Sequence, residues 1–278
     1  MADLFGWDIG TITGGQILPW AIIVFVIGIT ATIFRHELLL QEVDLLAGNP
    51  ALRSLYEDGI LPTIHDYFNY VRRGDIGIVK RFWDGGIVNV RDPSGRTDLQ
   101  AAAQTDSVIL VRGLIERGCA IEEASPQGLT ALNLAVQHGK LSVARELLVL
   151  GASPNAAYSS DQTTPLHCAV GRGDIAATDL LLDFGARIDQ SDCDQITPLM
   201  VAASQNKAEC AMKLIERGAN VFLRDVYGAS ALDYANSRNC KDVSERLKAL
   251  GAPGDPSKKM RGCGFSGAGK LRPKWDRE

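Results

Sequence analysis

The chain of 278 residues has no closely spaced pair of cysteines and no excess of basic residues. None of its six cysteines forms a CxxC pair, which argues against a zinc ribbon or a redox-active dithiol. Their spacing favours reduced thiols and leaves an oxidising compartment open. The 29 Lys and Arg residues stand against 33 Asp and Glu residues, a net charge of -4. This balance argues against a protein whose main role is to bind nucleic acid.

Residues with the spacing of a catalytic or metal site are also missing. Only four histidines are present, and they suggest no Ser/His/Asp or Cys/His arrangement. Residues 264–270 match the GxxxxGK pattern of a phosphate-binding loop, but Leu271 replaces the hydroxyl that binds magnesium, and Pro273 follows where a helix should begin. His167 and Cys168 are adjacent, so on a helix they would point about 100° apart. The sequence therefore predicts no enzyme activity, no cofactor and no metal.

One segment is apolar enough to cross a membrane. Residues 17–34 read ILPWAIIVFVIGITATIF, and the chain carries no formal charge from residue 9 to residue 34. As a helix, this stretch would span about 27 Å, close to the roughly 30 Å hydrocarbon core of a bilayer. A cleaved signal peptide is the alternative, but residues 1–16 contain no Lys or Arg and carry two aspartates. We therefore expect a short leader over residues 1–16 and a transmembrane helix over residues 17–34.

The basic residues around this segment predict its orientation. None precedes it, whereas Arg35 and Arg53 follow, so the positive-inside rule predicts an outside N-terminus and a cytoplasmic C-terminal part. Apolar and charged residues then alternate over residues 35–47 in a helical pattern, which Gly48-Asn49-Pro50 should end. A linker helix within residues 35–59 would hold the following domain near the membrane.

A period of 33 residues runs through the chain after residue 60. Glycines recur at intervals of 33, 33, 34, 33 and 33 residues: Gly85, Gly118, Gly151, Gly185, Gly218 and Gly251. A hydroxyl residue recurs in step, followed two residues later by leucine and five residues later by alanine: Thr97, Thr130, Thr164, Thr197 and Ser230. Periods of this length are typical of solenoids, in which each repeat buries its apolar stripe against its neighbours.

Residues 164–169, Thr-Pro-Leu-His-Cys-Ala, followed by Gly173 and Leu181-Leu182, resemble an ankyrin repeat, and residues 197–203 are similar to it. On these markers, the region from residue 60 to residue 252 is identified as a member of the ankyrin repeat family. The resemblance implies an all-α solenoid of about six repeats, each a helix-turn-helix with a loop projecting at right angles. It also implies a structural, hydrogen-bonded role for His167.

The two ends of the solenoid differ from its middle. The first repeat is expected to form helices over about residues 65–73 and 76–83, with aromatic residues that suit a terminal cap on the linker helix. The second helix of the last repeat is charged, as a solvated end requires. Within the repeats, a left-handed residue is expected between the helices. The residues at that place are Asp106, Gly139, Gly173, Asn206 and Asn239.

The last segment, residues 253–278, is basic and rich in glycine and proline. It carries seven Lys or Arg and three Asp or Glu residues, and this composition predicts a flexible tail. Two interpretations stay open: the tail contacts anionic lipids or an acidic partner, or it only adds solubility.

Recognition by ankyrin proteins usually uses the loop tips and the concave face formed by the first helices, and the resemblance implies the same here. The tip candidates are Arg96, Tyr158, Asp194, Arg224 and Tyr227. The concave candidates are Gln104, Gln137, His138, Arg172, Gln205 and Arg238. Tyr158 lies on a tip that is one residue longer than the others, where it is expected to act as an amphipathic anchor.

Three functions fit this organisation. The first is a membrane-tethered scaffold or regulator whose solenoid binds another protein. The second is a structural subunit of a larger membrane complex. The third is a periplasmic or luminal ankyrin protein, held by the same anchor in reverse, that inhibits or protects its partner. The identity of the partner cannot be derived from repeats, because loop tips carry no transferable code.

Overall fold

The computed structural model describes residues 49–158, 161–254, 260–266 and 270–275. The expected leader, the transmembrane helix at residues 17–34 and most of the linker lie outside these residues. No helix of the described part has the length and hydropathy needed to cross a bilayer.

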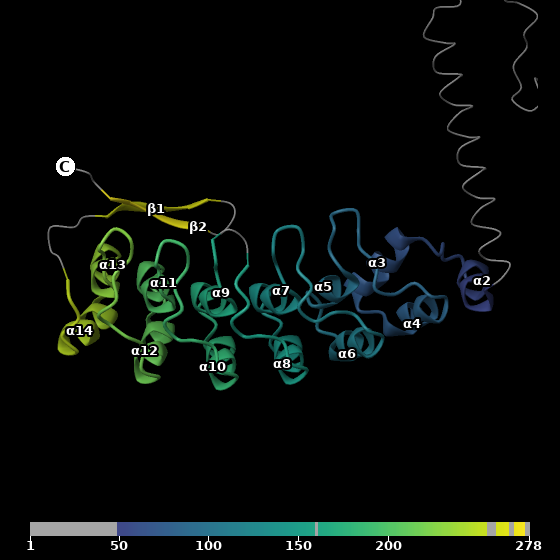
Figure 1. Cartoon of the computed structure of the whole chain (residues 1–278), viewed down its shortest axis with the longest axis horizontal. Helices are drawn as coiled ribbons and strands as arrows, with labels where there is room; N and C mark the ends of the chain where they lie inside the picture. The colour runs from purple at the N-terminus through teal and green to yellow at the C-terminus, as the bar shows by residue number, and fades with distance from the viewer. Residues whose placement is uncertain (1–48, 159–160, 255–259, 267–269, 276–278) are drawn as a thin grey trace, which may run out of the picture.

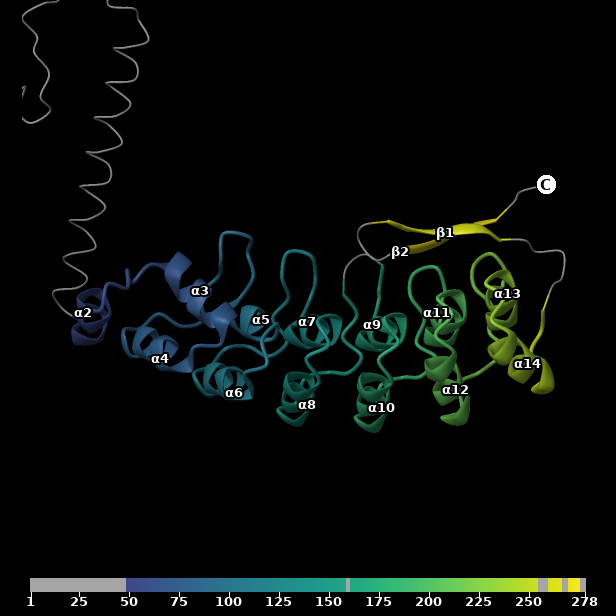
Figure 2. The ribbon, with the colours of Figure 1, turned by 180° about the vertical axis from the view of Figure 1, so that it is seen from behind.

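Six helix pairs stack side by side in one row over residues 64–249 (Figure 1). The first helices of the pairs are α3 (Ile64–Arg73), α5 (Asp98–Ala102), α7 (Ala131–Gln137), α9 (Pro165–Arg172), α11 (Pro198–Ser204) and α13 (Ala231–Ser237). The second helices are α4 (Ile76–Asp84), α6 (Val108–Glu116), α8 (Leu141–Val149), α10 (Ile175–Asp183), α12 (Ala208–Glu216) and α14 (Lys241–Ala249). The two sets form two layers, and the loops between pairs project from the side of the first helices (Figure 2). We call the surface formed by the C-terminal ends of the first helices and by the loop tips the first-helix face.

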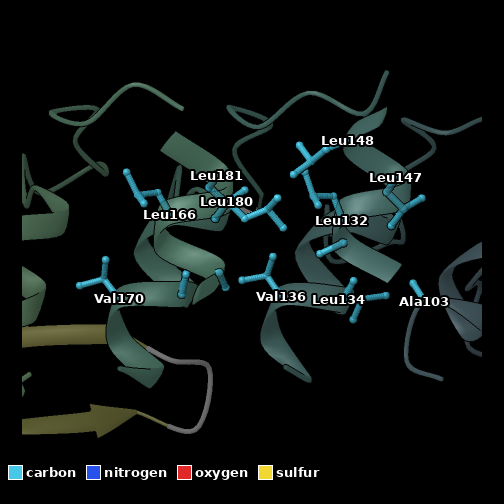
Figure 3. Close-up of a cluster of buried hydrophobic side chains, with 14 of the residues drawn as sticks. Ala103, Leu132, Leu134, Val136, Leu147, Leu148, Leu166, Val170, Leu180 and Leu181 are labelled. Atoms are coloured by element: carbon cyan, nitrogen blue, oxygen red, sulfur yellow. The ribbon is translucent and has the colours of Figure 1, made fainter. Parts of the chain in front are cut away.

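The repeated small and large residues make the core between the layers. The five alanines in step on the first helices are fully buried: Ala102, Ala135, Ala169, Ala202 and Ala235. The five leucines in step on the second helices are equally buried: Leu114, Leu147, Leu181, Leu214 and Leu247. Figure 3 shows such side chains between two neighbouring pairs, with Leu132 and Leu147 on one side and Leu166 and Leu181 on the other. Because alanine lets the helices approach and leucine fills the seam, the core is continuous along the solenoid.

Each first helix after α3 begins at the hydroxyl residue of its repeat. Thr97, Thr130, Thr197 and Ser230 each accept a hydrogen bond from the backbone N–H three residues later. This N-cap satisfies one of the donors that a helix start leaves without a partner. The threonine marker of the repeat is therefore a helix-start signal.

The turns between the two helices mostly have the left-handed residue that the sequence predicts. Gly139, Gly173, Asn206 and Asn239 have φ angles of 70°, 76°, 55° and 56°. The prediction is wrong for Asp106, which is not among the residues with positive φ. In that repeat, Thr105 closes the turn instead: its hydroxyl donates to the Ala102 carbonyl at 2.7 Å and accepts from the Ser107 N–H at 3.2 Å.

A short helix, α2 (Pro50–Glu57), precedes the first pair. The linker helix expected over residues 35–47 lies outside the described residues. Asn49 caps α2 by accepting from the N–H groups of residues 51 and 52, with Pro50 in the first turn, so the same residues also start a helix. The Asn49 side chain donates to the Gly85 carbonyl at 3.1 Å. Leu52 and Leu55 are buried, and a Cβ on Gly85 would lie 2.2 Å from Leu52 Cδ2, so α2 packs tightly at the end of α4.

Within the tail, residues 260–266 and 270–275 add β-structure to the all-α architecture. Strands β1 (Met260–Ser266) and β2 (Lys270–Trp275) pair antiparallel, with Phe265 opposite Leu271 and an irregularity between Met260 and Cys263. Basic and apolar residues alternate along β2, which is the period of a strand. The glycine and proline content of the tail concealed this alternation.

Candidate protein-binding surface

The loop tips on the first-helix face are braced by their own side chains. Asp92, Ser125, Asp192 and Asp225 each accept hydrogen bonds from the backbone N–H groups two and four residues later. Such turns fix the loop before any partner binds, which reduces the entropy cost of binding. Burial, with Asp194 and Asp161 nearby, raises the pKa of Asp192 to about 6.

Side chains near the start of the first helices tie each loop to the next repeat. Gln100 donates to the Leu129 carbonyl at 3.0 Å, and Asn133 donates to the Ala156 carbonyl at 3.3 Å. His167 makes the equivalent contact: its Nε2 lies 3.0 Å from the Ile196 carbonyl oxygen. Because a carbonyl oxygen only accepts, Nε2 carries the proton.

The other ring nitrogen of His167 faces its own helix cap. Its Nδ1 lies 2.8 Å from Thr164 Oγ1, and with Nε2 protonated it accepts from this hydroxyl. The ring is only 4% exposed, and burial lowers its pKa to about 4. These contacts agree with the structural role implied by the resemblance.

Four of the expected site residues lie together at the middle of the first-helix face. Arg172 donates from Nη1 to the Gln137 carbonyl at 2.8 Å, and its Nη2 lies 2.7 Å from the position of a Cβ on Gly139. His138 precedes that glycine on the exposed side of the turn. The pKa of its imidazole is lowered by partial burial and by the charges of Arg172, Lys140 and Arg96. We call Arg96, Gln137, His138 and Arg172 the central cluster.

The remaining expected residues of the first-helix face are more dispersed. Gln205 lies beside the helix of Arg172, with its side-chain nitrogen 3.4 Å from the position of a Cβ on Gly171. Gln104 is half-buried and turned toward the carbonyl of Gln100 in its own helix. Arg238 is exposed on the last repeat, and no contact joins it to the central cluster among the described residues.

The tips of the last two loops contact each other. The Val226 N–H donates to the Asp194 carbonyl at 3.1 Å, and Arg224 donates to the Gly228 carbonyl within its own loop. Sequence reasoning selected Tyr227 here, which is 45% exposed, but it missed Phe222 and Val226, which are 60% and 50% exposed. Three large apolar residues within six positions of a surface loop were the signal that could have identified them.

Tyr158 does not stand free on the lengthened tip as expected. It is half-buried, its N–H donates to the Thr163 carbonyl at 2.9 Å, and Cys168 Sγ lies 3.6 Å from its hydroxyl. Burial and the neighbouring Cys168 thiol raise its pKa. Tyr158 therefore helps to hold its loop against α9.

The structure also contains a buried polar network in the first repeats that the sequence did not reveal. Asp98 is fully buried, and its carboxylate accepts from the Tyr67 hydroxyl at 3.0 Å and from the N–H groups of Asn89 and Leu99 at 2.7 and 2.9 Å. Trp83 donates from Nε1 to the Tyr67 hydroxyl at 3.1 Å. Every group in this network has a partner, which is typical of a structural rather than a catalytic carboxylate.

No group of three or more His, Cys, Asp or Glu side chains within the described segments has the arrangement of a metal site. What the solenoid offers is a row of similar repeats with braced loops and polar, exposed helix ends. The family model of ankyrin repeats, in three copies, matches residues 68–158 and again residues 166–258. The chain belongs to the ankyrin repeat family. Ankyrin repeat proteins generally mediate contacts between proteins.

Individual relatives match parts of this ankyrin protein. An ankyrin repeat-containing protein of Treponema pallidum is 35% identical over 133 residues, which is 47% of this chain and 42% of the relative. Human SH3 and multiple ankyrin repeat domains protein 1 is 36% identical over 119 residues, 42% of this chain and 6% of the relative. Palmitoyltransferase Hip14 of Drosophila melanogaster is 30% identical over 89 residues, 32% of this chain and 14% of the relative. The chain thus spans less than half the length of each of these relatives.

Proposed function

We propose that this protein is a membrane-tethered scaffold or regulator that binds another protein through the first-helix face of its ankyrin solenoid. The observation that supports this most strongly is the central cluster beside braced loops. Its side chains are polar, and Arg172 is held in place by its hydrogen bond to the Gln137 carbonyl of the preceding repeat. A surface that is ordered before binding loses little entropy when a partner docks.

The proposed tether is the apolar segment at residues 17–34, with the N-terminus outside and the solenoid in the cytoplasm. Support comes from the length of the segment and from Arg35 and Arg53 behind it. Helix α2 adds a mechanical argument, because Asn49 and Leu52 attach the chain that follows the segment directly to the first repeat. A membrane anchor there would hold the solenoid close to the bilayer.

Site-specific photo-crosslinking tests the binding surface. A photoreactive residue at Gln137, which is exposed in the central cluster, should capture a protein in the native membrane. The matched control is the same residue at Arg145, which is exposed on the second helix of the same repeat. Capture from position 145 with equal yield, or from neither position, would contradict the proposal.

The second candidate is a subunit of a larger membrane complex, in which residues 17–34 pack on other membrane helices. The packed junction at α2 supports a membrane subunit as much as a tether, because the junction would transmit the orientation of the membrane helix to the solenoid. Replacing residues 1–34 with an unrelated anchor separates the two: partner capture at position 137 should persist for a tether and fail for a membrane subunit. No catalytic role is proposed for either.

The orientation has its own test. Cys193 is exposed on a loop tip, so a membrane-impermeant thiol reagent should label it in opened cells and not in intact cells. Labelling of Cys193 in intact cells would support the alternative of a periplasmic or luminal solenoid. Contact of the basic tail with anionic lipid stays a prediction.

A further inference from the structure

Some cations of the solenoid are paired with carboxylates, and others are not. On the second helices, Arg112 pairs with Glu146, and Arg217 pairs with Asp179 and Asp183. On the first-helix face, Arg96 and Arg172 form no ion pair with a carboxylate within the described part of the chain, and Lys207 forms none either. The positive charge of the first-helix face is therefore left available to a partner.

Two of these cations, Arg172 and Lys207, lie against the inter-helix turns of neighbouring repeats. Arg172 lies against the turn of the preceding repeat at Gly139, and Lys207 lies against the next turn, with its Cδ 3.0 Å from the position of a Cβ on Gly173. His138 lies beside Arg172, and partial burial together with the charges of Arg172, Lys140 and Arg96 lowers its pKa, so its imidazole is neutral near pH 7. Lys140 is paired with Asp106 at 2.7 Å, which leaves Arg96, Arg172 and Lys207 as the unpaired cations, with the neutral His138 among them. We call these four residues the cationic row.

We infer that the cationic row binds an extended acidic segment of a protein partner that carries a carboxylate at about every third residue. The inference rests on the proposed function and names the chemistry of the partner. Neighbouring helices pack about 9 Å apart, so Arg172 and Lys207, which belong to neighbouring repeats, give a charge spacing of about 9 Å. An extended peptide rises about 3.3 Å per residue, so its side chains at i and i+3 match that spacing.

A peptide fits this arrangement better than a lipid surface or a nucleic acid. The residues of the row come from four different repeats, and these repeats stack in one row with their loops on one side, so the residues do not cover a plane (Figure 1). Duplex DNA carries one charge per about 1.7 Å of its axis, a density that one cation per repeat cannot match. Guanidinium groups, in contrast, bind carboxylates through directed, charge-assisted hydrogen bonds.

The test uses the full chain in a neutral detergent and two labelled peptides. One consists of four Glu-Gly-Ser triplets, and the other has glutamine in place of each glutamate. The glutamate peptide should bind, and Arg172→Gln should weaken its binding about tenfold, as loss of a charge-assisted hydrogen bond predicts. Lys207→Gln, which removes no hydrogen bond of the described structure, should weaken it about fivefold. The matched control, Arg145→Gln on α8, should change it less than twofold.

Several results would overturn the inference. Equal binding of the two peptides would show that the carboxylates play no part in binding. Equal weakening by the variants at positions 172 and 145 would show that only net charge matters. Tighter, Arg172-dependent binding of phosphatidylserine vesicles or of duplex DNA would assign the row to a lipid or a nucleic acid. The His138 imidazole supplies an independent readout, because a bound carboxylate should raise its pKa in an NMR titration, and an unchanged pKa would contradict docking at the row.

Failure of this inference can be distinguished from failure of the proposed function. If crosslinking at Gln137 captures a partner through a segment without acidic residues, the solenoid still binds protein and only the acidic specificity is wrong. If position 137 captures nothing while the glutamate peptide binds, the row is an acidic-peptide site and the scaffold proposal fails.

Discussion

Replacing Gly113 with alanine should destabilise the solenoid, although alanine is the better helix former. Gly113 lies inside α6, where a Cβ would come within 2.8 Å of Trp83 Cη2 and 2.9 Å of its Cζ3. The indole cannot move away easily, because Nε1 donates to Tyr67 and the Arg117 guanidinium lies 4.2 Å from the ring centroid on its face. Helix propensity favours alanine by about 1 kcal/mol, but overpacking a filled core costs about 1–3 kcal/mol. The net expectation is a loss of about 1 kcal/mol.

Gly77 provides the matched control. It lies in the exposed part of α4, and its nearest neighbour to an added Cβ is Asp75 Oδ1 at 3.6 Å, an ordinary contact. Gly77→Ala should therefore stabilise by about 0.5–1 kcal/mol. Thermal unfolding followed by far-UV circular dichroism should separate the two variants by about 4–8 °C in Tm. If Gly113→Ala raised Tm as much as Gly77→Ala, the described contact of α6 with Trp83 would be wrong.

Four further predictions concern substitutions at partly or fully buried positions. Because burial lowers the pKa of His167 to about 4 from about 6.5 in an unfolded chain, the unfolded state takes up the proton first. Stability should therefore fall by up to about 3 kcal/mol as pH falls from about 6.5 to about 4, and His167→Gln should flatten that part of a urea-unfolding profile. Asp192 has the opposite effect, because its raised pKa makes the folded state bind a proton more tightly than the unfolded state. Its contribution to stability is full below about pH 4 and is lost as pH rises through about 6. Asp192→Asn should remove this loss of stability. Asp98→Ala should cost about 3 kcal/mol in urea unfolding because it leaves buried donors without an acceptor, and a cost below about 1 kcal/mol would contradict the network. Met200→His should raise the free energy of unfolding by about 1 kcal/mol, because the new imidazole could donate to the Ala229 carbonyl as His167 donates to the Ile196 carbonyl. Met200→Leu should leave the free energy of unfolding unchanged.

The helix pairs could be predicted because three features of each repeat recur at fixed spacings. A threonine that caps, an alanine that allows close approach and a leucine that fills the seam act locally, so their positions along the chain determine the helices. The turn at Asp106 shows the limit of this reasoning. Asp can adopt a left-handed conformation, but the hydroxyl of Thr105 next to it offered a different way to close the turn.

The features that sequence reasoning missed depend on contacts between distant residues or on ambiguous signals. The carboxylate of Asp98 and the hydroxyl of Tyr67 are 31 positions apart, and nothing in either residue indicates the other. Asn49 and Pro50 are typical both of a helix end and of a helix start, and sequence reasoning used them only as an end, so it missed α2 with its buried Leu52. The cationic row was partly predicted, as Arg96, His138 and Arg172. Lys207 was missed because it follows the turn and does not lie on the first helix.

The most direct test of the central claim, that the first-helix face binds a protein, is hydrogen–deuterium exchange of the full chain alone and with its captured partner. We predict that binding slows exchange at the loop tips, residues 92–97 and 125–130, and at the ends of α7 and α9. The second helices α8, α10 and α12 should exchange as they do without the partner. Protection confined to those second helices, with unchanged exchange at the tips, would contradict the account.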